Sequence, residues 1–223
     1  MSYIFTSESV SEGHSDKICD QISDAILDEC LKSDPNSRVA CETLIKNNNV
    51  IVAGEITTSA CVDYEAVARK VVRDIGYIEE ELGFTSSGFE FQNLISEQSK
   101  DIDAGISGDE SLGSGDQGLM FGFACKETPE LMPLPIQIAQ RLTERLTVLR
   151  KEGKLPWLRP DGKSQVSVKY DGTLPISIEK TVIATQHDDM LDKYGNEDSE
   201  LEFVKSQVVE NVIRPCLLYT SPS

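Results

Sequence analysis

A histidine and an aspartate stand two positions apart in the run Gly13-His14-Ser15-Asp16-Lys17, where an irregular segment enters a predicted helix. In an extended segment, residues two apart share a side, so the side chains of His14 and Asp16 would face one way. The N-terminus of the following helix would also favour a bound anion. The simpler alternative is that Asp16 caps the helix and His14 is solvated, and the local pattern by itself favours it.

Two glutamates lie inside strand-like segments. Glu42 shares a strand face with Leu44, and Glu55 shares one with Ala53. An acid among apolar neighbours costs free energy unless it is paired, protonated or bound to a metal ion. Exposure on an open sheet face would remove that cost, and the pattern does not choose between the two interpretations.

The segment 113–118 (Gly-Ser-Gly-Asp-Gln-Gly) has the G-x-G-x-x-G spacing. It lacks the context of a dinucleotide site, because it follows a polar segment and precedes a predicted strand rather than a helix. Its glycines instead allow close approach of backbone to backbone or to a ligand. Asp116 is the one candidate functional side chain among them.

The segment 157–164 combines Pro and Gly before a predicted strand, a composition typical of a turn. This turn would carry Asp161 and Lys163 at its tip. A solvated turn is the simpler interpretation, and the local pattern favours it.

Hydrophobic periodicity predicts the elements that position these residues. Helices are predicted over 16–33, 135–151 and 198–213, and a fourth between an Asp63 cap and Gly76. Strands are predicted over 38–45, 49–57, 89–95, 119–125, 164–170 and 174–185. Because the strands come in adjacent pairs rather than alternating singly with helices, the predicted fold class is α+β with mostly antiparallel sheets.

The segment 96–112 separates two such groups of elements. It is rich in Gly, Ser, Asp and Glu and is longer than the usual connection within a domain. Such a segment is a linker, an active-site lid or disordered. We expect an amino-terminal α+β domain over residues 1–100 and a central α+β domain over residues 113–215.

Composition limits the classes of function. The chain has 223 residues and a net charge of −17, which argues against a nucleic-acid binder or an anionic-membrane binder. No apolar run is long enough to span a membrane, and the first residues lack the features of a signal peptide. The six cysteines form no C-x-x-C pair, so we expect free thiols in a cytoplasmic protein and no zinc site.

Several of these segments together form a pattern more specific than any one of them. The pattern comprises residues 6–14 (Thr-Ser-Glu-Ser-Val-Ser-Glu-Gly-His), 40–43 (Ala-Cys-Glu-Thr), 54–57 (Gly-Glu-Ile-Thr), 115–122 (Gly-Asp-Gln-Gly-Leu-Met-Phe-Gly) and 155–161 (Leu-Pro-Trp-Leu-Arg-Pro-Asp). In order and spacing it resembles S-adenosylmethionine synthetase (methionine adenosyltransferase) from Phe5 to about Pro215.

The resemblance implies a fold of three related α+β domains, of which about two are present. It implies ATP and L-methionine as ligands, and a reaction in which the methionine sulfur attacks the ribose C5′ of ATP. The expelled triphosphate is then hydrolysed to pyrophosphate and phosphate. Because charge builds on the leaving triphosphate, catalysis would rest on alignment and fixed cations.

The resemblance also assigns the ATP contacts. His14 would donate a hydrogen bond to the departing 5′ oxygen, and Lys163 would counter phosphate charge, so both are catalytic candidates. Asp161 would contact ATP as well, and Asp116 would lie near the ribose.

The methionine and metal contacts follow in the same way. Glu55 and Gln98 would contact methionine across the subunit interface of a homodimer or a dimer of dimers. Asp16 would bind Mg²⁺, and Glu42 would bind K⁺. The segment 96–112 would be the family's mobile active-site loop.

Some positions depart from the family pattern. Ser15 stands where the family usually has Pro, and Ser114 stands where it usually has Ala. Residues 216–223 look foreign to the family, and the family's carboxyl-terminal domain, which carries further phosphate-binding groups, is absent from this sequence. We therefore expect the chain alone to be inactive, and the alternative function is that of a non-catalytic remnant that binds ATP or methionine.

Overall fold

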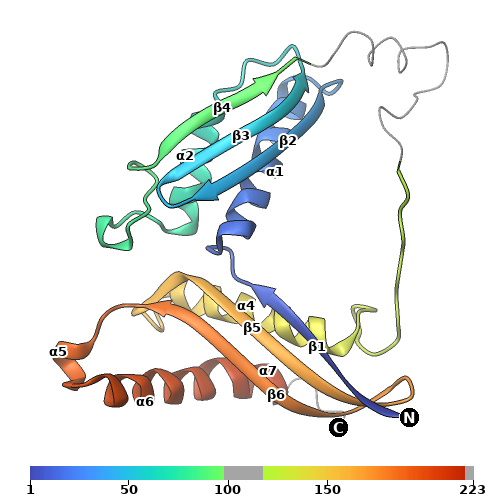
Figure 1. Cartoon of the computed structure of the whole chain (residues 1–223), viewed down its shortest axis with the longest axis vertical. Helices are drawn as coiled ribbons and strands as arrows, with labels where there is room; N and C mark the ends of the chain where they lie inside the picture. Colours follow the sequence, from blue (N-terminus) through green and yellow to red (C-terminus); the bar gives the residue numbers. More distant parts are fainter. Residues whose placement is uncertain (98–117, 219–223) are drawn as a thin grey trace. The chain divides into compact units, whose positions relative to one another are not determined.

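The computed structural model describes residues 1–97 and 118–218 of the chain. They divide between two compact units, one formed from the described parts of Met1–His14 and Phe123–Ser223, the other from those of Ser15–Gly122. The α+β class expected from the sequence is confirmed, because each unit has one three-stranded sheet with helices packed on it (Figure 1).

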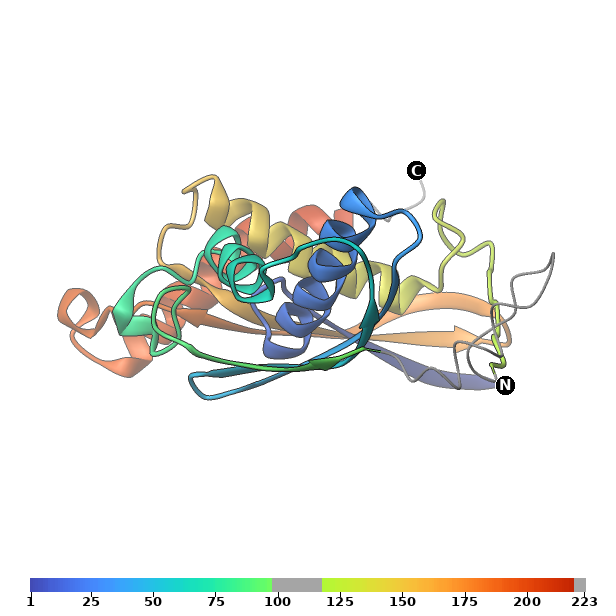
Figure 2. The same cartoon turned by 90° about the horizontal axis from the view of Figure 1, so that it is seen from above.

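The sheet of the Ser15–Gly122 unit has the order β2-β3-β4. Strand β2 (Arg38–Lys46) is antiparallel to β3 (Asn49–Thr57), whereas β4 (Glu90–Ser96) is parallel to β3. Helices α1 (Ser15–Ser33) and α2 (Tyr64–Ile75) cover one face of this sheet, and the short helix η1 (Glu80–Leu82) lies between α2 and β4 (Figure 2). The parallel pair is an exception to the predicted antiparallel pattern.

Periodicity explains why these helices pack as they do. Helix α1 buries one residue per turn, at Ile18, Ile22, Ile26 and Cys30. Helix α2 begins where the Asp63 carboxylate accepts a hydrogen bond from the Ala66 amide at 3.0 Å and ends at Gly76 in the left-handed conformation. Both predicted ends of α2 are therefore confirmed.

The other unit has the fully antiparallel sheet β1-β5-β6. Strand β1 is Ser2–Val10, β5 is Leu158–Asp171 and β6 is Leu174–His187. Alternate residues of β5 are buried against helix α4 (Leu134–Lys151), and the others form the open face of the sheet. The remaining helices are α5 (Leu191–Tyr194), α6 (Glu197–Val208), the π-helical turn η2 (Val209–Ile213) and α7 (Arg214–Leu218).

Two predictions of local structure are wrong, and one strand is not predicted at all. Ser2–Val10 forms that strand, β1, by pairing with β5. The segment 157–164 is not a free turn, since most of it forms the irregular beginning of β5. Residues 119–125 form no strand, since a strand needs a neighbouring strand for its backbone groups and none pairs with this segment among the described residues.

The helix predicted over 198–213 also differs in the structure, where η2 interrupts it and α7 extends the helical run to Leu218. Helices of the described ranges were searched for a membrane span, and none is long and apolar enough.

Candidate functional site

The end of β1 is fastened to an irregular stretch of β5. The register of the β5–β6 pair shifts between Leu158 and Gly162. The buried Ser11 donates its amide to the Gly162 carbonyl at 2.8 Å and its hydroxyl to the Pro160 carbonyl at 2.7 Å. These two hydrogen bonds fix the point at which the chain leaves the sheet.

A tight turn follows this anchor. The His14 amide donates to the Ser11 carbonyl at 3.1 Å, which leaves Glu12 and Gly13 at the centre of the turn. A Cβ atom added to Gly13 would lie 2.3 Å from the Pro160 Cβ and 2.5 Å from its carbonyl carbon and oxygen. Only glycine fits so close to this backbone. Because Gly13 contacts Pro160, the next residue, His14, is held near this part of β5.

Asp161 and Lys163 lie on the β5 strand beside this turn. Lys163 is paired in register with Val10 and projects from the open face of the sheet, where it is exposed. The Asp161 Oδ1 atom is buried, and no hydrogen-bond partner for it is found among the described residues. An unpartnered carboxylate oxygen is costly, so Asp161 is suited to accept a hydrogen bond from a ligand. Both residues belong to the strand, not to the tip of a turn.

The surroundings of Asp161 combine basic and acidic side chains. A small hollow beside Asp161 is lined by Arg150 and Arg159, together with Ser11, Gly162 and other residues. Arg159 is paired with the Asp188 carboxylate, and Arg150 is paired with Glu12. Sequence analysis missed Glu12, Arg150 and Arg159 as parts of this region. Glu12 and Arg159 lie within the family pattern, but no charge pattern pointed to Arg150.

The structure corrects the arrangement expected for the metal ligand Asp16. Helix α1 begins at Ser15, so Asp16 is an exposed acid in the first helical turn. His14 and Asp16 therefore do not share the side of one extended segment. Because α1 begins at Ser15, Asp16 lies inside the first helical turn rather than just before the helix, and the pair has no common face of an extended segment.

Glu42 and Glu55 lie on the outer face of the β2-β3-β4 sheet, away from its helices. Glu42 is paired in register with Ala53, and Glu55 with Ala40, so the two carboxylates are diagonal neighbours. Glu42 is exposed and Glu55 is half-buried. The exposed alternative is the one that the structure supports, and the sheet face presents both acids together.

The other two predicted ligand contacts, Gln98 and Asp116, lie outside the described residues, as does almost all of the predicted loop over 96–112. In the described ranges, no group of three or more His, Cys, Asp or Glu side chains could hold a metal ion by itself. A Mg²⁺ ion at Asp16 would therefore depend on other oxygen donors, as is usual for Mg²⁺ bound through phosphates and water.

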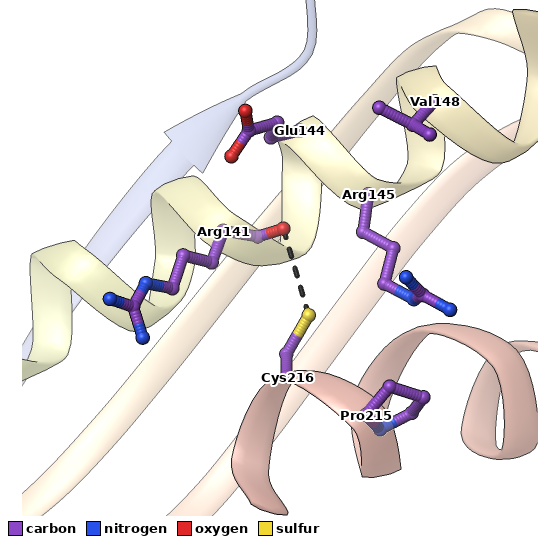
Figure 3. Close-up of a pocket in the computed structure, with 6 residues that line it drawn as sticks. All are labelled: Arg141, Glu144, Arg145, Val148, Pro215 and Cys216. Carbon is purple, nitrogen blue, oxygen red and sulfur yellow. Dashed lines mark hydrogen bonds between the residues drawn. The ribbon is translucent and has the colours of Figure 1, made fainter. Parts of the chain in front are cut away.

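A larger groove lies between α4 and α7 (Figure 3). It has a volume of about 380 Å³ and is lined by Arg141, Glu144, Arg145, Val148, Pro215 and Cys216. The Arg145 side chain donates to the Asn211 carbonyl, Arg141 is paired with Glu130, and burial raises the pKa of the Cys216 thiol. None of the predicted site residues lines this groove, and its arginines are already engaged.

The fold and the site define an α+β protein with two sheet-and-helix units, in which acidic and basic side chains gather at the end of β1 and on the open sheet faces. A family model described as the S-adenosylmethionine synthetase N-terminal domain matches residues 2–100. A second, described as the central domain, matches residues 111–221. The chain therefore belongs to the S-adenosylmethionine synthetase family.

Curated relatives agree with this assignment. An S-adenosylmethionine synthase of Sulfurovum sp. (strain NBC37-1) is 52% identical over 96% of this chain and 54% of the relative. One of Helicobacter hepaticus is 49% identical over 97% of this chain and 54% of the relative. One of Brachyspira hyodysenteriae is 54% identical over 83% of this chain and 50% of the relative. The chain spans about half the length of the curated relatives it matches.

The domain boundaries remain predictions. The central-domain match extends to residue 221 and so includes most of the tail predicted to be foreign at 216–223. Within that tail, the structure describes α7 to Leu218 and buries Cys216.

Proposed function

We propose that the chain supplies ATP-binding and methionine-binding residues for S-adenosylmethionine synthesis. In this reaction the lone pair of the methionine sulfur forms the bond to C5′ of ATP, and the C5′–O5′ bond breaks. The electron pair of that bond leaves with the triphosphate, and the product is a sulfonium. Water then cleaves the triphosphate to pyrophosphate and phosphate. A thioether needs no deprotonation, so the protein's task is alignment and charge stabilisation.

The single observation that carries this proposal is the junction of the Ser11–His14 turn with β5. It holds His14 next to the segment with the unpartnered Asp161 oxygen and the exposed Lys163. In the proposed function His14 donates a hydrogen bond to O5′ as that atom gains charge. Asp161 accepts a hydrogen bond from ATP, Lys163 neutralises phosphate, and Asp116 lies near the ribose.

Metal ions and a second copy complete the proposal. Mg²⁺ at Asp16, when bound with ATP, would neutralise phosphate charge. Glu42 would contribute one oxygen donor to K⁺. The described residues provide no complete cage for K⁺, and no step is assigned to it.

The outer face of the β2-β3-β4 sheet supports the proposed homodimer or dimer of dimers. Around the two glutamates it leaves Leu44 58% and Leu94 62% exposed, and a second copy that covered this face would bury both side chains. We propose that a second copy covers this face and that Glu55 and Gln98 contact methionine there.

Titration of the chain with ATP and Mg²⁺ tests the proposal. Lys163→Met should weaken ATP binding by about tenfold or more, because a hydrogen bond to a charged group contributes about 1.5–3 kcal/mol. Lys169→Met is the matched control, since Lys169 is an exposed lysine on the same face of the same strand. Equal affinities in the two variants, or no binding at millimolar ATP, would contradict the assignment of the phosphate site.

A product assay separates the enzyme from the alternative of a non-catalytic binder. Purified chain is incubated with ATP, methionine, Mg²⁺ and K⁺, and S-adenosylmethionine is measured. We expect ATP binding without measurable product. A triphosphate carries about four charges, and Lys163 is the one basic side chain of residues 150–163 that is not paired with an acid among the described residues. Product formation that His14→Asn abolishes would instead establish catalysis by this chain.

A further inference from the structure

A partly buried ion-pair cluster holds the turn that precedes His14. The Glu12 carboxylate accepts hydrogen bonds from the Arg150 guanidinium and, at 2.8 Å, from Lys151 Nζ. The Glu12 side chain is 20% exposed and that of Arg150 13%, whereas Lys151 is 46% exposed. The contact between Glu12 and Arg150 joins residues 138 positions apart in the chain.

The position of the cluster relative to the turn gives it a specific consequence. Glu12 is the second residue of the turn closed by Ser11 and His14, and Gly13 lies against Pro160. One side of the turn is thus fixed by the backbone of β5. The Glu12 side chain ties the turn to the last turn of α4 as well.

The last turn of α4 is well suited to hold an acid. Arg150 and Lys151 stand at its carboxyl end, where cations interact favourably with the helix dipole. The Arg150 side chain is held on a rigid helix and also lines the hollow beside Asp161. Two cations on one partly buried carboxylate form a network, which orders side chains better than an isolated exposed pair.

We propose that Glu12 and Arg150 are positioning residues for His14. Their ion pair holds the turn against α4 and so keeps the imidazole in one orientation. This role rests on the proposed function for its catalytic meaning, because His14 is there the donor to O5′. Lys151 contributes less, since its side chain is the more exposed of the two cations.

The histidine resonances of the full chain test the proposal directly. The chain has two histidines, and His187 lies at the end of β6, so it serves as an internal reference. In Glu12→Gln and in Arg150→Met, the ring signals of His14 should broaden or split while those of His187 stay in place. The control is Glu152→Gln, which removes the acid of an exposed pair with Lys154 just beyond α4.

A double-mutant cycle adds a readout that a general loss of stability would not produce. Glu12→Gln should weaken ATP·Mg²⁺ binding by about threefold or more when His14 is present, and by less than about twofold in a His14→Asn background. Glu12→Asp, which retains the charge, should restore part of the loss. Thermal unfolding of each variant establishes that it is folded.

The outcomes distinguish the two proposals. His14 signals that are unchanged in both Glu12→Gln and Arg150→Met overturn the positioning role, whatever ATP does. Equal losses of ATP affinity with and without His14 also overturn it. If His14 responds to Glu12 but the unaltered chain binds no ATP, the positioning role stands and the proposed function fails.

Discussion

Gly13→Ala tests whether the close approach of the turn to β5 builds the site. The added Cβ would lie 2.3 Å from the Pro160 Cβ and 2.5 Å from its carbonyl group, whereas ordinary contact begins at 3.4 Å. The turn or the strand must therefore retreat by about 1 Å, and backbone atoms cannot rotate away. Overpacking of this kind costs about 1–3 kcal/mol, and we expect the upper half of that range because backbone opposes backbone.

Gly162→Ala is the matched control, because it alters a glycine in the same junction. Its added Cβ would lie 3.4 Å from the Ala184 carbonyl oxygen and 3.5 Å from the Ser11 hydroxyl, which is ordinary contact. A glycine-to-alanine change in such a position stabilises by about 0.4–1 kcal/mol, because it lowers the entropy of the unfolded chain. The two substitutions are chemically identical and should change the free energy of unfolding in opposite directions.

The single tryptophan makes the assay specific to one unit. Trp157 is buried in the unit that contains the turn, so its fluorescence during urea unfolding reports the free energy of unfolding of that unit. Gly13→Ala should also shift the His14 ring signals. Equal unfolding free energies for Gly13→Ala and Gly162→Ala would refute the steric argument, because the clash at Gly13 would then have no effect on stability.

Two further predictions concern stability. Tyr170→Phe should lower the free energy of unfolding, measured by Trp157 fluorescence, by about 1.5–3 kcal/mol, because the Tyr170 hydroxyl donates to the Glu127 carboxylate at 2.7 Å; no change would show that this hydrogen bond is not maintained in solution. Hydrogen bonds from the backbone amide groups of Ser59 and Asn36 lower the pKa of Asp34. The stability that the ionised Asp34 contributes to the folded chain is therefore present above the ordinary carboxyl pKa and is lost as the pH falls through the lowered pKa. Asp34→Asn should therefore destabilise the chain at pH 7 and make its stability less dependent on pH below 4, and parallel pH profiles of the urea midpoint would contradict this.

The elements predicted correctly are those specified by neighbouring residues. Helix α1 follows from apolar residues one turn apart, and the β2–β3 hairpin from two strand-like runs around a polar turn. Helix α2 is marked at both ends by Asp63 and Gly76. Each of these signals lies within a window of about 20 residues or fewer, so the sequence contains it in readable form.

The elements that are missed or predicted wrongly depend on distant partners. Strand β1 forms because Ser2–Val10 pairs with β5, and Ser2 lies opposite Asp171. The apolar run at 119–123 has the composition of a strand, but Phe121 and Phe123 are 90% and 76% exposed. Local pattern cannot show whether a strand-like segment finds a partner, and this explains both errors.

The residues of the candidate site also divide into those that the sequence can reveal and those that depend on distant contacts. His14, Asp161 and Lys163 were selected by resemblance, and the structure brings their segments together through hydrogen bonds of Ser11. The local pattern had assigned Asp161 and Lys163 to a solvated turn. Glu12 and Arg150 were not selected, because an ion pair between residues so far apart in the chain leaves no periodicity to detect.

The charges around the junction explain why Lys163 is the side chain to test for phosphate binding. Residues 150–163 contain five basic and two acidic side chains, a net charge of +3 in a chain of −17. Four of the five are held by acids: Arg150 and Lys151 by Glu12, Lys154 by Glu152 and Arg159 by Asp188. A cation held in this way cannot turn toward a ligand without leaving its carboxylate unpaired.

Lys163 has no such acidic partner among the described residues, and it projects from the open face of β5. One uncommitted lysine cannot balance a triphosphate of about four charges, so under the proposed function we expect ATP to bind together with Mg²⁺, for which Asp16 is the proposed ligand.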